Sequence, residues 1–169
     1  MKRVAYPAAL AAALILHSGA IAAPPTPSGS SWSTISFEMR SWGRILSTWR
    51  VSVSGAGNWT QSTDDGGKEM MAVHELAVGP DGFAQVATIL DGLPSPAPDS
   101  ATCESFMPDQ PYGVVRMTNG ATTTEIAWNA GCMDDPYLGF LKPLREANDL
   151  VKSWGEKGKV IRSEPVAAN

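Results

Sequence analysis

The sequence is poor in the side chains that most catalytic and metal sites use. Of its 169 residues, 2 are histidines and 2 are cysteines. His17 lies in the N-terminal segment described below, so the rest of the chain has His74 alone. A metal site built from several histidines is therefore excluded there, and any catalytic triad would have to use His74.

Motifs that identify common enzyme classes are also missing. The sequence contains no G-x-S-x-G nucleophile turn, no phosphate-binding loop and no dinucleotide-binding glycine pattern, and it predicts no cofactor. Basic residues are outnumbered by acidic ones, 13 to 17. This balance argues against nucleic acid or an anionic membrane surface as a partner, because both need a basic binding surface.

The N-terminus carries the one long apolar run of the sequence. Lys2 and Arg3 precede an apolar stretch at 4–16, and small residues follow it up to the Ala-x-Ala pattern at 20–22. A basic start, a short apolar middle and an Ala-x-Ala end are typical of a secretory signal peptide. The stretch is shorter than the roughly 20 residues that a membrane-spanning helix needs. We therefore predict that residues 1–22 are a signal peptide, removed after export.

Export sets the expected location and the state of the cysteines. The mature chain would keep about 147 residues, enough for one ordinary domain, and a formal charge of about −6. We expect a periplasmic or secreted protein with no membrane span after signal cleavage. In an oxidising compartment Cys103 and Cys132 are expected to form a disulfide, and a reactive thiol pair or a metal pair is the alternative.

The first half of the mature chain has the pattern of strands followed by a helix. Residues 23–33, rich in Pro, Ser and Gly, predict a flexible segment. Beyond it, apolar and polar residues alternate with the period of half-buried strands, and a helical apolar face follows Gly79-Pro80. The predicted ranges are 35–42, 49–53, 58–61 and 69–78 for the strands and 79–92 for the helix.

The clearest turn signal is Asn119-Gly120, a pair that favours a two-residue type I′ hairpin. The resulting register sets Met117 opposite Thr122 and makes Arg116 and Glu125 diagonal neighbours on the solvent side. The same register predicts a buried face made of Val115, Met117, Ile126 and Trp128.

A second helix is predicted after Cys132, with Asp134 or Asp135 as its cap. Pro136 and Pro143 both suit a helix start, so either place can begin it. Its apolar face is predicted to consist of Leu144, Ala147, Val151 and Trp154.

The order of these elements predicts an α+β fold. We expect an antiparallel sheet built from two hairpin units, each followed by one helix, with the helices packed on one face of the sheet. Residues 34–158 would form this single domain, and residues 159–169 would form a loose C-terminal tail.

Few residues are candidates for catalysis. His74 lies in an apolar strand pattern, where a packed or edge-facing histidine is the ordinary role. A glycosidase-type pair or a calcium site could be formed by the paired carboxylates at 64–65 and 134–135, or by Glu104 with Asp109. However, residues 64–65 lie in a glycine-rich loop and residues 134–135 precede a helix, and both are ordinary places for Asp. A small periplasmic hydrolase using carboxylates or His74 is therefore the second hypothesis.

Tryptophan is the residue in surplus, with 6 in the chain. Several of them gather around the first hairpin, where strand alternation cannot bury all of them on one side. Trp42 shares the outward parity of Arg40, and Arg44 follows at the turn. Exposed tryptophan binds sugar rings or protein surfaces because it offers a large rigid area with one polar group.

The first hypothesis is an exported, non-enzymatic binding domain that binds a protein or glycan of the cell envelope, such as an inhibitor or partner of an envelope or secreted hydrolase. Its expected binding residues are Trp42, Trp59, Arg40 and Arg44.

Overall fold

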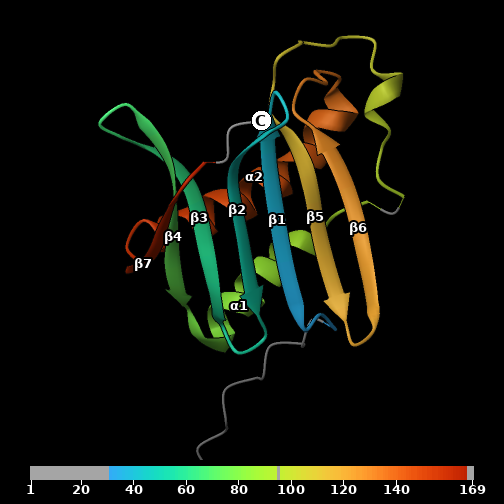
Figure 1. Cartoon of the computed structure of the whole chain (residues 1–169). Coiled ribbons are helices and arrows are strands. Elements are labelled where there is room, and N and C mark those ends of the chain that lie inside the picture. Colours follow the sequence, from blue (N-terminus) through green and yellow to red (C-terminus); the bar gives the residue numbers. More distant parts are fainter. Residues whose placement is uncertain (1–30, 95, 167–169) are drawn as a thin grey trace, which may run out of the picture.

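The computed structural model describes residues 31–94 and 96–166, so the predicted signal peptide and residues 23–30 lie outside the described residues. It contains one seven-stranded antiparallel sheet and two α-helices, and the α+β class predicted from the sequence is confirmed (Figure 1). In chain order the elements are β1 (Thr34–Ser41), β2 (Arg44–Ser52), β3 (Ala56–Asp65), β4 (Lys68–Ala77), α1 (Gly79–Leu90), a 3₁₀ turn η1 (Ser100–Thr102), β5 (Tyr112–Asn119), β6 (Thr122–Asn129), α2 (Asp135–Gly155) and β7 (Val160–Pro165).

The strand order in the sheet is β6-β5-β1-β2-β3-β4-β7. The first four strands are sequential neighbours and lead into α1, and the β5–β6 hairpin then joins the free edge of β1 and leads into α2. Three of the hairpin turns have two-residue loops, and two of these loops are Trp42-Gly43 and Gly66-Gly67. All four of these loop residues have a positive φ, the pattern of type I′ turns, whose twist matches that of the flanking strands.

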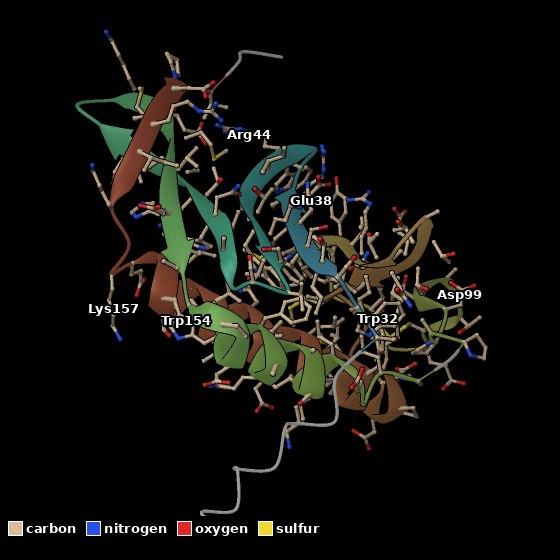
Figure 2. The ribbon with its side chains drawn as sticks, turned by 90° about the horizontal axis from the view of Figure 1, so that it is seen from below. Trp32, Glu38, Arg44, Asp99, Trp154 and Lys157 are labelled. Carbon is tan, nitrogen blue, oxygen red and sulfur yellow. A yellow bond between two sulfur atoms is a disulfide. The ribbon has the colours of Figure 1, made fainter. Side chains whose placement is uncertain are left out.

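Both helices lie on the same side of the sheet (Figures 1 and 2). Between them and the sheet is a single core, with Phe37 stacked on Trp49 and on Trp128 at ring-centroid distances of 5.5 and 5.2 Å. The indole of Trp49 donates a hydrogen bond to the Asn148 side-chain oxygen of α2 at 3.2 Å. The helices contribute these buried residues: Phe83, Val86, Ala87 and Leu90 from α1, and Tyr137, Phe140, Leu141, Leu144, Ala147 and Val151 from α2.

The register of the β5–β6 hairpin differs from the prediction. Asn119 pairs with Thr122, so the loop is Gly120-Ala121, and Gly120 alone of the two has a positive φ, as a type II′ turn requires. Arg116 consequently lies directly opposite Glu125 and forms an ion pair with it. The shift is two residues, so each side chain keeps its face. Val115, Met117 and Trp128 are buried as predicted, and Ile126, predicted on the same face, is half-buried.

The C-terminal half settles one open prediction and contradicts another. Helix α2 begins at Asp135, with Asp134 as its N-cap and Pro136 in its first turn, so the earlier of the two predicted starts is confirmed and Pro143 lies inside the helix. Residues 160–165, expected within the loose tail, form β7, which pairs with β4. All six residues of β7 are exposed, so the strand shows no apolar alternation in the sequence, and its position depends on pairing with the edge of β4.

Figure 2 shows Glu38 and Arg44 on the side of the sheet opposite to the helices. No helix covers that side within residues 31–94 and 96–166. Three of the four candidate binding residues, Arg40, Trp42 and Arg44, lie on this open face or in the turn at its end.

Candidate functional site

Trp42 stands at the tip of the β1–β2 hairpin and is 75% exposed, the most exposed of the large hydrophobic side chains described. Its φ is 51°, a conformation that Gly, Asn and Asp adopt far more readily than a bulky residue. Two side chains hold the turn from outside: Tyr112 accepts a hydrogen bond from the Gly43 N–H at 3.1 Å, and Arg40 donates one to the Gly43 carbonyl at 3.2 Å. The indole is thus presented to solvent on a fixed turn.

Arg40 and Arg44, both predicted site residues, flank this turn. Arg40 forms an ion pair with Glu38, with Nε and Oε1 2.7 Å apart, and this hydrogen bond raises the pKa of Arg40. Arg44 forms an ion pair with Glu69 of β4, and Glu69 also accepts a hydrogen bond from the Ser62 hydroxyl at 2.7 Å. Both guanidinium groups are therefore charge-compensated and oriented.

Two cavities meet at Trp42. One, of about 980 Å³, lies on the open face and is lined by residues that include Trp42, Arg44, Met71 and Arg162. The other, of about 310 Å³, is lined by Trp42, Phe106 and Tyr112 with four polar residues. An apolar ligand group entering either cavity would contact the indole.

The second cavity identifies residues that the sequence reasoning missed. Phe106, Met107, Tyr112 and Met133 are all exposed, and Phe106 and Tyr112 line this cavity together with Trp42. We call Trp42, Phe106 and Tyr112 the aromatic end. A sequence signal existed for Phe106, because Phe106-Met107 is an apolar pair inside a polar, proline-containing segment next to a cysteine.

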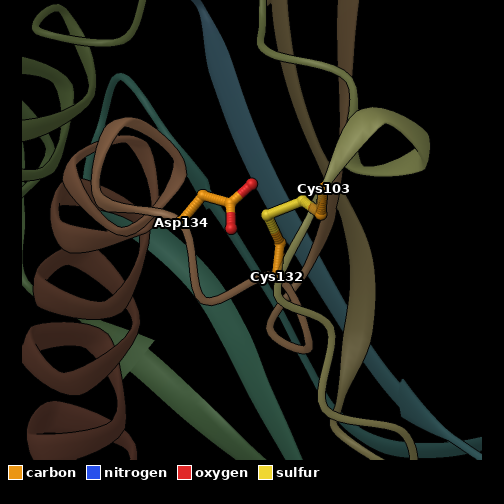
Figure 3. Close-up of side chains that lie close together, drawn as sticks. All are labelled: Cys103, Cys132 and Asp134. Carbon is orange, nitrogen blue, oxygen red and sulfur yellow. A yellow bond between two sulfur atoms is a disulfide. The ribbon is translucent and has the colours of Figure 1, made fainter.

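A clamp holds the segment that carries Phe106. The predicted disulfide between Cys103 and Cys132 is present, and Figure 3 shows the Asp134 carboxylate beside it. This carboxylate accepts hydrogen bonds from the backbone N–H groups of Glu104 and Ser105, at 2.9 and 3.0 Å. The three side chains resemble a metal-ligand cluster in their spacing, but sulfur in a disulfide is not a thiolate, so the group acts as a clamp.

Trp59 does not belong to the binding surface, which corrects the prediction. It is 2% exposed and lies on the helix side of the sheet, packed edge-on against His74 at a ring distance of 4.9 Å. Its place in the core follows from pairing opposite Trp49, on the face that the helices cover.

Two of the candidate catalytic groups, His74 and Asp64, have structural contacts. His74 Nδ1 lies 3.3 Å from the Gly158 carbonyl oxygen, and its ring contacts Trp59, so neither recorded neighbour is an acid or a nucleophile. Asp64 accepts a hydrogen bond from the Gly67 N–H at 2.7 Å and closes the β3–β4 turn. These contacts give His74 and Asp64 structural roles.

Comparison of the chain with protein-family models, with curated proteins and with solved structures gave no match. No α-helix in the described part of the chain is long and apolar enough to cross a membrane.

Proposed function

We propose that this protein is an exported, non-enzymatic binding domain whose ligand is a folded protein, an envelope or secreted hydrolase. The aromatic end is the centre of the binding surface, and Arg40 and Arg44 lie at its rim. The observation that carries this proposal is Trp42, an indole that is 75% exposed and has a φ of 51° at a turn position where small or polar residues are preferred. Neither property benefits the fold, and strained conformations of this kind are found most often at functional sites.

The composition of the surface favours a protein partner. Binding energy in protein interfaces concentrates in aromatic and arginine side chains at the centre of the contact, surrounded by polar groups. The aromatic end has three aromatic side chains from β1–β2, from the loop after Cys103 and from β5, and Arg40 lies opposite Tyr112 in the sheet. Export agrees with the disulfide, since cysteines pair stably outside the cytoplasm.

Affinity capture from an envelope and secreted fraction, followed by identification of the retained protein and direct binding measurements, tests the proposal. Trp42→Asn is the informative variant because asparagine suits the turn, so the fold is kept. We expect it to weaken binding by about 30-fold or more, the effect of losing a hot-spot side chain. Val53→Ser is the matched control, since Val53 is also an exposed apolar residue but follows the other end of β2. Equal affinity of both variants for the captured protein would falsify the assignment of the aromatic end.

A further inference from the structure

We propose that Glu104–Asp109 is a substrate-like loop that enters the active-site cleft of an endopeptidase, with Phe106 in the pocket that accepts a large apolar side chain. This inference rests on the proposed function and names the class of its partner. We call Glu104–Asp109 the clamped loop.

The clamped loop is exposed throughout. Each of its six residues is solvent-exposed, and two large apolar side chains, Phe106 and Met107, stand next to each other at 50% and 48% exposure. The Phe106 ring lies against Gly131, but about half of each side chain remains in contact with water, and contiguous exposed apolar surface marks sites of interaction. Phe106 also lines the cavity shared with Trp42 and Tyr112, so the loop and the aromatic end form one surface.

The backbone at Phe106 is arranged as a strand with one edge open. Phe106 and Cys132 form an isolated antiparallel bridge, in which Met107 N–H donates to Gly131 O at 2.7 Å and Met133 N–H donates to Ser105 O at 2.9 Å. In such a bridge the two flanking residues make the hydrogen bonds, and the backbone groups of the central residue point away. The N–H and C=O of Phe106 therefore face outward, where an enzyme cleft that binds substrate as an added strand can pair with them.

The loop is fixed on the side that precedes Phe106. The Cys103–Cys132 disulfide and the two hydrogen bonds to the Asp134 carboxylate hold residues 103–105. Asp134 stands at the N-cap of α2, yet its side chain makes no capping hydrogen bond to the helix, because both of its oxygens are used by the loop. A loop already fixed in its bound form loses little conformational entropy on binding.

The same contacts explain how the loop would resist digestion. Cleavage of the Phe106–Met107 peptide bond adds one water, leaving a carboxylate on Phe106 and an amine on Met107. The first product end stays attached through the disulfide and the Ser105–Met133 hydrogen bond, and the second through the Met107–Gly131 hydrogen bond. Because the two ends remain together, they do not leave the cleft, and the peptide bond can re-form.

Titration of protease activity with the purified, oxidised protein tests this inference. Chymotrypsin and subtilisin, which accept large apolar side chains, are the probes, and trypsin, whose pocket accepts basic side chains, is the comparison enzyme. We expect inhibition of at least one of the two probes and none of trypsin. Phe106→Gly should weaken the inhibition by about 100-fold. Phe106→Arg should transfer inhibition to trypsin, a result that a merely structural role of Phe106 would not produce.

Two further measurements keep the outcome decisive. Asp134→Asn, which leaves one acceptor oxygen for two N–H donors, should increase the rate of cleavage between Phe106 and Met107, measured by mass spectrometry, while Val53→Ser should not. The inference is overturned if neither chymotrypsin nor subtilisin is inhibited, or if the loop is cleaved as fast as a linear peptide of the same sequence. If inhibition fails but Trp42→Asn still weakens binding of the captured partner, the proposed function stands and only the class of partner is wrong.

Discussion

Substitutions of Trp42 separate the backbone strain of the first hairpin from the contribution of the indole side chain. It occupies the first central position of a type I′ turn, with a φ of 51°, and Gly43 follows with a φ of 77°. A side chain with a β-carbon pays about 1 kcal/mol in this left-handed conformation, and asparagine avoids most of that cost. Both Trp42→Asn and Trp42→Ala remove the indole, but only Trp42→Asn relieves the strain.

The magnitude follows from the exposure of the side chain. Trp42 is 75% exposed, so about a quarter of its area, roughly 60 Å², is buried, which contributes about 1.5 kcal/mol. Trp42→Ala should lose this amount and keep the strain. Trp42→Asn should lose the same amount and regain about 1 kcal/mol, a net loss of about 0.5 kcal/mol.

Urea unfolding, followed by the fluorescence of the remaining tryptophans, measures the difference. We expect Trp42→Asn to be more stable than Trp42→Ala by about 1 kcal/mol, with equal m-values, or by roughly 2–4 °C in Tm. If Trp42→Ala proves as stable as Trp42→Asn, the turn is not strained at this position and the backbone of Trp42 does not mark a functional site.

Two other substitutions test the packing and the register. Gly155→Ala in α2 would place a β-carbon 2.5 Å from the Trp59 ring and should lower the free energy of unfolding by about 1–3 kcal/mol. Gly139 is an exposed position of the same helix with no atom within 4 Å of an added β-carbon, so Gly139→Ala should raise the free energy of unfolding by about 0.5–1 kcal/mol. Thermal unfolding of both variants measures the two effects. Gly120→Ala should lower the free energy of unfolding by about 1 kcal/mol because the φ of Gly120 is 57°. Asn119→Thr, at a paired strand position, should change it by less than about 0.5 kcal/mol. If urea unfolding shows Asn119→Thr to be the more destabilising of the two, the loop is Asn119-Gly120 after all.

Sequence periodicity predicted the elements whose burial follows a regular spacing. The alternation at Ile35 and Phe37 marks β1, and the spacing of Phe83, Val86 and Leu90 marks α1, because one face of each is removed from water. The polar strand β3 was predicted too short, since its residues 62–65 are Ser, Thr, Asp and Asp, which show no apolar alternation and are held by pairing with β4.

The register of the β5–β6 hairpin shows why a local turn rule was insufficient. Asn119-Gly120 favours type I′, but the observed register sets Arg116 against Glu125 and lets the Thr118 and Thr123 hydroxyls hydrogen-bond at 3.0 Å. Cross-strand pairs of this kind each contribute about 0.2–1 kcal/mol, and several together outweigh one turn preference. The turn preference of Asn119-Gly120 alone therefore does not determine the register.

The candidate site was predictable only in part. The exposure of Trp42 agrees with its parity in the strand pattern, but the burial of Trp59 depends on His74 and Gly155, which are distant in the sequence. The neighbourhood of Trp42 and Phe106 depends on the strand order, which places β5 beside β1 across more than 70 residues of chain. No local pattern encodes that contact.

The two type I′ turns of the sheet differ in how well their residues suit a positive φ. At the β3–β4 turn both loop residues, Gly66 and Gly67, suit a positive φ, and Asp64 closes the loop with its side chain. The β1–β2 turn has the same geometry but carries Trp42, which suits it poorly. At the same end of the molecule Asp134 leaves its own helix uncapped by its side chain, and Phe106 is exposed. Sequences agree with their fold at most positions, and conflicts are expected where function constrains the residue. Because these three conflicts occur on segments that meet around one surface, a single binding interface accounts for all of them together.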